Sequence, residues 1–217
     1  MSAPGTDTVS GSDASKSAGS SLLELVVVVA VALGLALGIQ AFLIKPFRIP
    51  SGSMLPTLQV GERVLVNRVG THLRDPHIGD ILVFHPPTSA ESDLGPQCAK
   101  PPNAFTPCAT PGVKEAKVNF IKRVVGLPGD TIAIRDGHVV RNGKLQRESF
   151  ISHTCDGGSG NACNLRHTIT VPKGHYFMMG DNRGESDDSR YWGPIPKRWI
   201  IGGAFATYWP PKRIGTL

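Results

Sequence analysis

Cysteine is scarce in this chain, and no two of its four cysteines have the Cys-x-x-Cys spacing. That absence argues against zinc-finger and thioredoxin-type sites. No repeat with a solenoid or propeller period is visible, and no amphipathic helical stripe of useful length follows the first fifty residues. Glycine (25) and proline (18) are plentiful instead. This composition favours turn-rich β structure over a helical bundle.

The sequence also lacks a cluster of charges of one sign. Lysine and arginine exceed aspartate and glutamate by 23 to 17, giving a net charge of +6. The basic residues are scattered, and neither zinc-finger spacing nor a recognition helix accompanies them. We therefore expect a solvated surface that tolerates anionic lipid, and no binding of nucleic acid.

The long apolar run lies near the N-terminus. Residues 1–21 are mostly small and polar, a composition that predicts a disordered tail. Residues 22–44 then read LLELVVVVAVALGLALGIQAFLI, interrupted by Glu24 and Gln40, and are long enough to cross a bilayer as one helix. A cleavable secretory signal is the alternative, but no basic region precedes the run and no small-x-small site follows it before Lys45. A permanent membrane anchor is the interpretation that we favour.

The orientation of this anchor stays open from the residues alone. Lys16 stands by itself before the span, whereas Lys45 and Arg48 follow it, so the positive-inside rule would place the rest of the chain in the cytoplasm. The same rule weakens for long translocated domains. The cysteines favour the opposite side, because they form two close pairs in turn-rich segments, Cys98 with Cys108 and Cys155 with Cys163. Disulfides there require an oxidising compartment, and free thiols are the alternative.

Residues 45–217 predict an all-β domain. Alternating or apolar β-prone runs separated by turn signals occur at 61–69, 79–85, 118–126, 130–144, 167–181 and 200–209. The run at 130–144 contains Asp-Gly and Asn-Gly, two strong hairpin signals. An irregular insertion is expected at 86–117.

A candidate nucleophile follows the anchor directly, in IPSGSMLPTL (49–58). Pro50 and Pro56 stiffen the backbone, and Gly52 permits close approach by another chain. A serine nucleophile needs such a rigid, accessible setting and a base to accept its proton. By itself Ser-Gly-Ser is also common in ordinary loops.

A candidate base lies in VNFIKRVVGLPGD (118–130). In a strand, Phe120, Lys122 and Val124 would share one face. A solvated surface lysine is the plain interpretation. A lysine buried beside a serine is the alternative with consequences for chemistry, because desolvation lowers its pKa. Lowering the lysine pKa from about 10.4 to about 7–8 costs roughly 4 kcal/mol, and it yields a neutral amine that can act as a base near pH 7.

A polar loop follows an apolar strand in GHYFMMGDNRGESDDSRYWGPIP (174–196). Its acidic residues could suggest calcium, but the spacing does not fit an EF-hand, and Arg183 and Arg190 favour internal ion pairs. None of the seven histidines occupies a recognisable catalytic context, so a Ser-His hydrolase is not expected.

These segments, in this order behind an apolar span, closely resemble the bacterial type I signal peptidases, a Ser/Lys-dyad serine protease family. IPSGSMLPTL, GDILVF, NFIKRVVGLPGD and GDNRGESDDSRYWGPIP correspond to its recurrent boxes. The resemblance implies an antiparallel β-sheet catalytic domain preceded by one transmembrane helix. It assigns Ser53 as nucleophile and Lys122 as general base. Gly184-Glu185 departs from the family pattern, in which Asp-Asn is more usual.

The resemblance also implies supporting roles. The Ser53 N–H and the Ser51 hydroxyl match the oxyanion hole, and Ser186 matches the serine that orients the lysine. The remaining matches are a structural ion pair and the substrate pockets: Asp188 with Arg190, and Phe47, Ile49 and Ile121. We expect no cofactor and no metal, and a monomer that acts on preprotein signal peptides after small residues such as Ala-x-Ala. It would be a single-pass protein of the bacterial inner membrane, with a cytoplasmic N-terminus and an extracytoplasmic catalytic domain.

Three other functions remain to be weighed. A self-cleaving repressor of the same clan would need a helix-turn-helix where the apolar span stands. An anchored Ser/Lys processing peptidase with a narrow substrate range is a close variant. A non-catalytic anchored envelope module belongs to another class, and the presence of both Ser53 and Lys122 argues against it.

Overall fold

The computed structural model describes residues 18–91, 107–109, 114–152, 155 and 163–217. The chain divides into two compact units, Met1–Ala41 and Phe42–Leu217.

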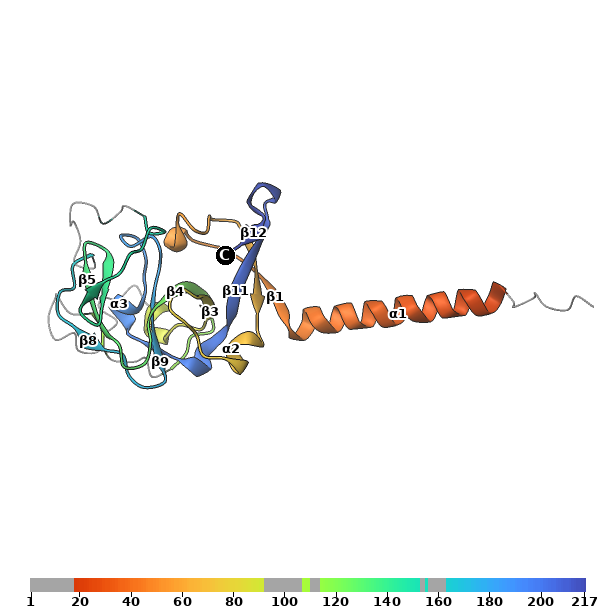
Figure 1. Cartoon of the computed structure of the whole chain (residues 1–217), viewed down its shortest axis with the longest axis horizontal. Coiled ribbons are helices and arrows are strands. Elements are labelled where there is room, and N and C mark those ends of the chain that lie inside the picture. The colour runs from red at the N-terminus through yellow and green to blue at the C-terminus, as the bar shows by residue number, and fades with distance from the viewer. Residues whose placement is uncertain (1–17, 92–106, 110–113, 153–154, 156–162) are drawn as a thin grey trace, which may run out of the picture. The chain divides into compact units, whose positions relative to one another are not determined.

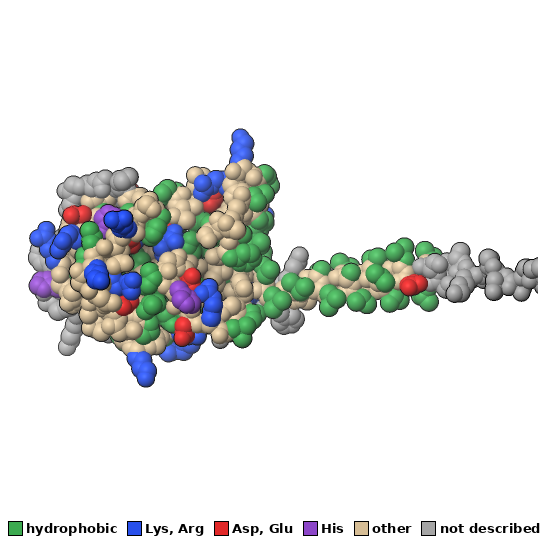
Figure 2. Space-filling view, in the orientation of Figure 1, with side chains coloured by type: hydrophobic (Ala, Val, Ile, Leu, Met, Phe, Trp, Pro, Cys, Tyr) green, Lys and Arg blue, Asp and Glu red, His purple; other side chains and the backbone are tan. Residues whose placement is uncertain are grey.

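The described part of the first unit is helical and belongs to α1 (Ala18–Phe42) (Figure 1). Within it, Leu22–Ile39 is long and apolar enough to cross a bilayer, and none of its side chains is buried in the structure. Its surface is hydrophobic, with an acidic side chain toward the N-terminal end (Figure 2). The helix ends before the predicted span does, because Ile44 already belongs to strand β1 (Ile44–Arg48). Pro46 is consistent with this early end, because in a continued helix its ring would clash with the carbonyl of Phe42, four residues earlier.

The second unit is built on antiparallel strands, which confirms the predicted fold class (Figure 1). Its main sheet has the order β1-β2-β11-β3-β4-β9-β10, and β12 pairs with β11. The strands besides β1 are β2 (Arg63–Asn67), β3 (Ile81–Phe84), β4 (Phe120–Gly126), β9 (His175–Met179), β10 (Ile195–Pro196), β11 (Ile200–Trp209) and β12 (Gly215–Thr216). All of these pairings are antiparallel, so β1 and β4 run in the same direction across the sheet.

A smaller sheet has the order β7-β6-β5-β8. Its strands are β5 (Thr131–Arg135), β6 (His138–Arg141), β7 (Lys144–Leu145) and β8 (Ile169–Thr170). Two-residue turns join the first three, and Asp136-Gly137 and Asn142-Gly143 have positive φ at both positions. This is the geometry that two-residue hairpins require, and it explains why the two dipeptides predicted the hairpins correctly.

Helices in this unit are short. They are α2 (Gly70–Leu73), α3 (Ser189–Trp192) and single 3-10 turns, including η1 (Gly52–Met54) and η2 (Thr88–Glu91). Most of the predicted insertion at 86–117 lies outside the described residues, although Pro87 and Glu115 form an isolated antiparallel bridge.

Two apolar clusters hold the segments that carry the candidate site. Beneath residues 49–58, Ile49, Met54 and Leu58 pack with side chains of β2 and β3, among them Val64 and Val83. A second cluster joins β3, β4, β9 and α3 through Leu82, Phe84, Val124, Met178 and Trp192. Removing one such buried side chain costs about 2–5 kcal/mol, so both segments have little freedom to move.

The predicted bridge between Cys155 and Cys163 is present, with 5.6 Å between the Cα atoms. Cys108 is buried and disulfide-bonded, but Cys98, its predicted partner, lies outside the described residues. On the face shown in Figure 2, the Lys and Arg side chains of the domain are dispersed.

Candidate active site

Ser53 lies in the 3-10 turn that follows β1. Residue Ile49 is fixed on both sides, since its N–H donates to Glu62 O at 2.8 Å and its carbonyl accepts from Gly61 N at 2.8 Å. Met54 and Leu58 are fully buried below the turn, and the Leu58 N–H donates to Met54 O. Ser53 itself is 8% exposed. The turn therefore presents its hydroxyl from a rigid support.

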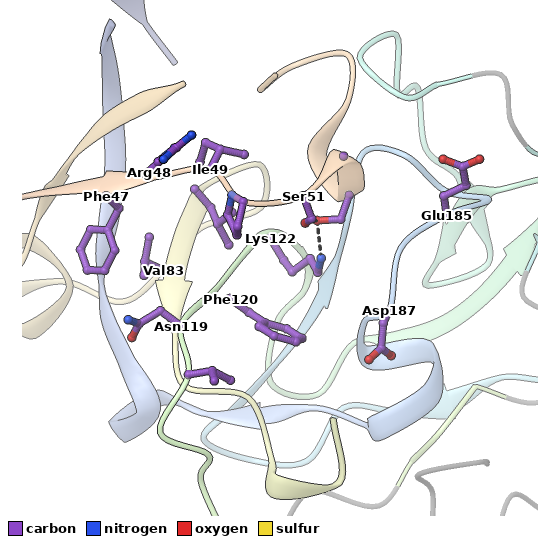
Figure 3. Close-up of a pocket in the computed structure, with 15 residues that line it drawn as sticks. Phe47, Arg48, Ile49, Ser51, Val83, Asn119, Phe120, Lys122, Glu185 and Asp187 are labelled. Carbon is purple, nitrogen blue, oxygen red and sulfur yellow. Dashed lines mark hydrogen bonds between the residues drawn. The ribbon is translucent and has the colours of Figure 1, made fainter. Parts of the chain in front are cut away.

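Lys122 reaches the same point from β4. It pairs in register with Leu82 of β3, and its side chain is only 4% exposed. Its Nζ donates a hydrogen bond to Ser53 Oγ at 2.6 Å (Figure 3). The Phe120 ring lies 5.5 Å from the same Nζ. Two residues separated by 69 positions in sequence are thus brought into direct contact.

The surroundings weaken the affinity of Lys122 for its proton. Burial lowers the pKa of Lys122 to about 8, with Asp188 and Asp187 acting to raise it and Arg190 acting to lower it. At pH 7 about a tenth of the amine is then neutral. A lysine with an ordinary pKa would be neutral in only a minute fraction of molecules, so this site supplies far more base near neutral pH.

Asp188 and Arg190 form a buried two-point ion pair beside the lysine. Arg190 Nε lies 2.8 Å from Asp188 Oδ1, and Nη2 lies 2.9 Å from Oδ2. Although burial alone would raise the pKa of Asp188, the Arg190 guanidinium holds it below its usual value. Asp188 also accepts from the Gly180 N–H at 3.1 Å, and Arg190 donates to Ser186 O at 3.2 Å. The pair therefore fixes the loop that passes the dyad.

Ser186 is buried in this loop, and among the described side chains its Oγ has no hydrogen-bond partner. A Cβ at Gly180 would collide with this Oγ and with the carbonyl of Ser53. Gly180 thus allows Ser186 and the nucleophile segment to approach each other closely. The lysine-orienting role of Ser186 stays a prediction.

Asn182 is a contact that the sequence did not reveal. Its N–H donates to Ser53 O and its Nδ2 donates to Gly52 O, each at 3.1 Å. Its Oδ1 accepts from Ser152 Oγ at 2.9 Å. Asn182 therefore fixes the backbone of the nucleophile turn through the carbonyls of Gly52 and Ser53.

Asp181 and Arg123 form a second unforeseen link, since the ion pairs expected within the loop were those of Arg183 and Arg190. Arg123 bonds both oxygens of the buried Asp181, at 2.9 and 2.7 Å, and the Thr57 hydroxyl donates to the same carboxylate. Arg183 pairs instead with Glu148 at 2.8 Å. The charged residues of 174–196 correctly indicated ion pairing. They could not indicate the partners, because Arg123 and Glu148 lie far from this segment in the sequence.

A cleft of about 640 Å³ surrounds the dyad (Figure 3). Residues 47–53 form one wall and residues 118–122 the other. The three predicted pocket residues Phe47, Ile49 and Ile121 all line it. β9 pairs with β4 from Arg123 onward. Residues 120–122 thus lie before the part of β4 that β9 covers, and an extended peptide could pair there.

Comparison with known proteins places the chain in a family. The family description "Signal peptidase, peptidase S26" matches residues 22–209. A signal peptidase I of Leptolyngbya laminosa is 36% identical over 200 residues, covering 92% of this chain and 86% of the relative. A signal peptidase I of Pseudomonas aeruginosa is 34% identical, covering 85% and 72%. A crystal structure of a signal peptidase I from Enterococcus faecalis V583 is 26% identical, covering 60% of this chain and 97% of that one, with a TM-score of 0.39.

The protein is accordingly a hydrolase of the serine endopeptidase class. Within that class, the chain belongs to the signal peptidase family, peptidase S26.

Proposed function

We propose that this protein removes N-terminal signal peptides from exported preproteins, with Ser53 as nucleophile and Lys122 as general base. One observation carries the assignment of the residues. The buried Lys122 amine, with its pKa lowered to about 8, lies 2.6 Å from Ser53 Oγ in a cleft that can admit a peptide.

The reaction begins when the neutral Lys122 amine takes the proton of Ser53 and Oγ attacks the scissile carbonyl carbon. The resulting ammonium gives that proton to the leaving nitrogen as the peptide bond breaks. A water molecule, deprotonated by the same amine, then cleaves the Ser53 ester and releases the signal peptide. Neither step requires a cofactor or a metal ion.

Charge develops on the carbonyl oxygen during each attack. The Ser53 N–H and the Ser51 hydroxyl would donate to it; the two serine hydroxyl oxygens lie 3.4 Å apart, so Ser51 stands beside the reacting atom. Such donors contribute about 3–4 kcal/mol each in other hydrolases. Ser186 would hold the amine in place during this exchange, since its buried hydroxyl lies in the loop that passes Lys122.

The substrate would lie extended between the two walls of the cleft. Phe47, Ile49 and Ile121 give the end of the cleft before the dyad an apolar lining, which suits small side chains such as alanine at the cleavage site. The chain carries both dyad residues itself, so one copy suffices and we propose a monomer.

We further propose a single-pass protein of the bacterial inner membrane, with α1 in the bilayer, the N-terminus in the cytoplasm and the catalytic domain outside. The Cys155–Cys163 bridge supports this orientation, because disulfides persist in oxidising compartments.

Cleavage of a preprotein in detergent tests the assignment. Wild-type protein should shorten the preprotein, whereas Ser53→Ala and Lys122→Ala should not. Lys122→Arg should fail as well, because a guanidinium stays protonated. Substantial cleavage by Lys122→Arg would contradict the assigned base.

A further inference from the structure

The cleft that holds the dyad carries charges of opposite sign at its two ends. Its charged lining residues are Arg48, Lys122, Glu185 and Asp187. In Figure 3, Arg48 and Phe47 lie on one side of the dyad, and both carboxylates lie on the other. The end beyond the dyad is therefore acidic.

Glu185 is exposed to solvent at this end, so its charge faces any chain that passes. Its Oε2 accepts from Asn182 Nδ2 at 3.1 Å. This partner is a neutral amide, so the bond orients the carboxylate and leaves its charge in place. The same Nδ2 donates to Gly52 O, so the Asn182 amide connects the carboxylate to the nucleophile turn.

The direction of the substrate follows from the proposed function, on which this inference rests. The apolar end of the cleft takes the small residues that precede the cut bond. The chain that leaves after cleavage must then emerge past Ser53 and Lys122, toward Glu185 and Asp187.

We propose that Glu185, assisted by Asp187, makes the leaving-group end of the cleft selective for the charge of the first residues after the cut bond. Basic side chains are favoured there and acidic ones are disfavoured. The preference acts through charge at a solvated rim, so it is moderate in size and is weakened by salt.

A set of peptides tests this selectivity. They share one sequence up to the cut bond and differ only in the second residue after it, which is lysine, alanine or glutamate. For the full-length wild-type protein in detergent at low salt, kcat/KM should be about three- to tenfold higher for the lysine peptide than for the glutamate peptide. The ratio should approach one as the ionic strength rises toward about 1 M.

Glu185→Gln is the deciding variant, because glutamine keeps an acceptor for Asn182 and removes the charge. Its lysine-to-glutamate ratio should fall most of the way to one. Asp136→Asn is the matched control, a carboxylate lost from the β5–β6 turn, where asparagine tolerates the positive φ; its ratio should equal that of wild type. The ratio compares two substrates on one preparation, so it does not depend on how much of a variant is folded.

The outcomes separate the two proposals. Cleavage without a charge preference, or a preference that Glu185→Gln retains, overturns this inference and leaves the proposed function standing. Failure of the wild-type protein to cleave any peptide or preprotein overturns both.

Discussion

Lys122 is a base whose strength is set by opposing neighbours. Burial weakens its hold on the proton, Asp188 and Asp187 strengthen it, and Arg190 weakens it again. Of these three charged neighbours, Asp188 has the largest effect on the Lys122 pKa, and Arg190 binds Asp188 in two places. Removing the Asp187 charge should lower the proton affinity of Lys122 and leave the Asp188–Arg190 ion pair in place.

The rate should depend on pH accordingly. Because the reactive form is neutral Lys122, kcat/KM of the wild-type protein should rise with pH through about 8 and then level off. Asp187→Asn removes a charge that raises this pKa, so the rise should move to lower pH. A pH profile measured on both proteins, with Asp136→Asn as control, checks this; a midpoint that stays in place or moves upward would contradict it.

The same burial should reduce stability at neutral pH. The Lys122 pKa is 10.5 when unperturbed and about 8 in the folded protein, so between these values the unfolded chain binds more protons and the free energy of unfolding rises with pH. Below pH 8 the full cost is about 3 kcal/mol. Lys122→Met should therefore be more stable than wild type at pH 7, by at most this amount, and its advantage should shrink toward pH 10.5. Urea unfolding of both proteins at pH 7 and near pH 10.5 measures the difference in their free energy of unfolding. An equal difference at the two pH values would refute the prediction.

Sequence indicated residues whose surroundings are local, and it missed those whose partners are distant. Ser53 stands in a proline-stiffened turn and Lys122 in an apolar strand, and both features are visible in short windows. These features alone left an ordinary loop and a solvated lysine open, and the family resemblance singled out the two residues. Asn182 gave no such signal, because its bonds to Gly52 and Ser53 depend on how the loop folds back across 130 positions. The ion pair of Arg123 with Asp181 could not be predicted for the same reason. The alternation of the strand predicts only that the side chains of Arg123 and Lys122 point to opposite faces.

Among the elements, the segment at Gly180–Asn182 joins the two halves of the site. Asn182 holds the nucleophile turn, and Gly180 leaves room for both Ser186 and the carbonyl of Ser53. The segment follows β9 directly, and β9 pairs with β4 next to Lys122, where Met179 lies opposite Arg123.

Gly180→Ala should consequently abolish most of the activity. The added methyl group must displace Ser186 or Ser53, and a displacement of about 1 Å at a reacting group can cost a hundredfold in rate. Gly203→Ala is the control, because a Cβ at that strand position meets only Leu82 at 3.8 Å. Cleavage assays and circular dichroism of both variants test this. Comparable activity in the two would show that the close approach at Gly180 is dispensable.

Strands were predicted correctly where the residues between them are typical of a specific turn type. Asp136-Gly137 and Asn142-Gly143 placed the β5–β6–β7 hairpins correctly, since their positive φ values suit these residues. Strand β1 was not predicted, because Pro46 argues against a strand and Ile44 reads as part of the apolar run. As a strand at the end of the sheet order, β1 tolerates proline.

For the molecule as a whole, the Cys155–Cys163 disulfide cross-links residues that do not line the cleft around the dyad. Cys155 and Cys163 are buried, and a Cβ at Gly137 would meet Cys155. Replacing both cysteines by serine should lower the free energy of unfolding by roughly 2–3 kcal/mol, the entropy of a loop this short. The kcat/KM of the folded protein should change little. Urea titrations check the loss of stability, and peptide cleavage checks the kcat/KM. A large loss of activity in a fully folded variant would contradict the expectation that kcat/KM changes little.

The orientation across the membrane has its own test. Protease added to right-side-out spheroplasts should degrade the domain from residue 45 onward, because we place it outside the cytoplasm. A cytoplasmic marker protein must stay intact in the same sample. Protection of the domain would show that Lys45 and Arg48 obey the positive-inside rule after all.

Strand β11 lies between β2 and β3, although it comes near the end of the chain. Strands β1 and β2, which come before and after Ser53 in the chain, are on one side of it, and strand β4, which carries Lys122, is on the other. During biosynthesis, therefore, the nucleophile and the base are made early but the sheet that aligns them is completed only when residues 200–209 arrive. We therefore expect a chain that has not yet placed residues 200–209 in the sheet to be inactive, and to become active once this central strand is in place.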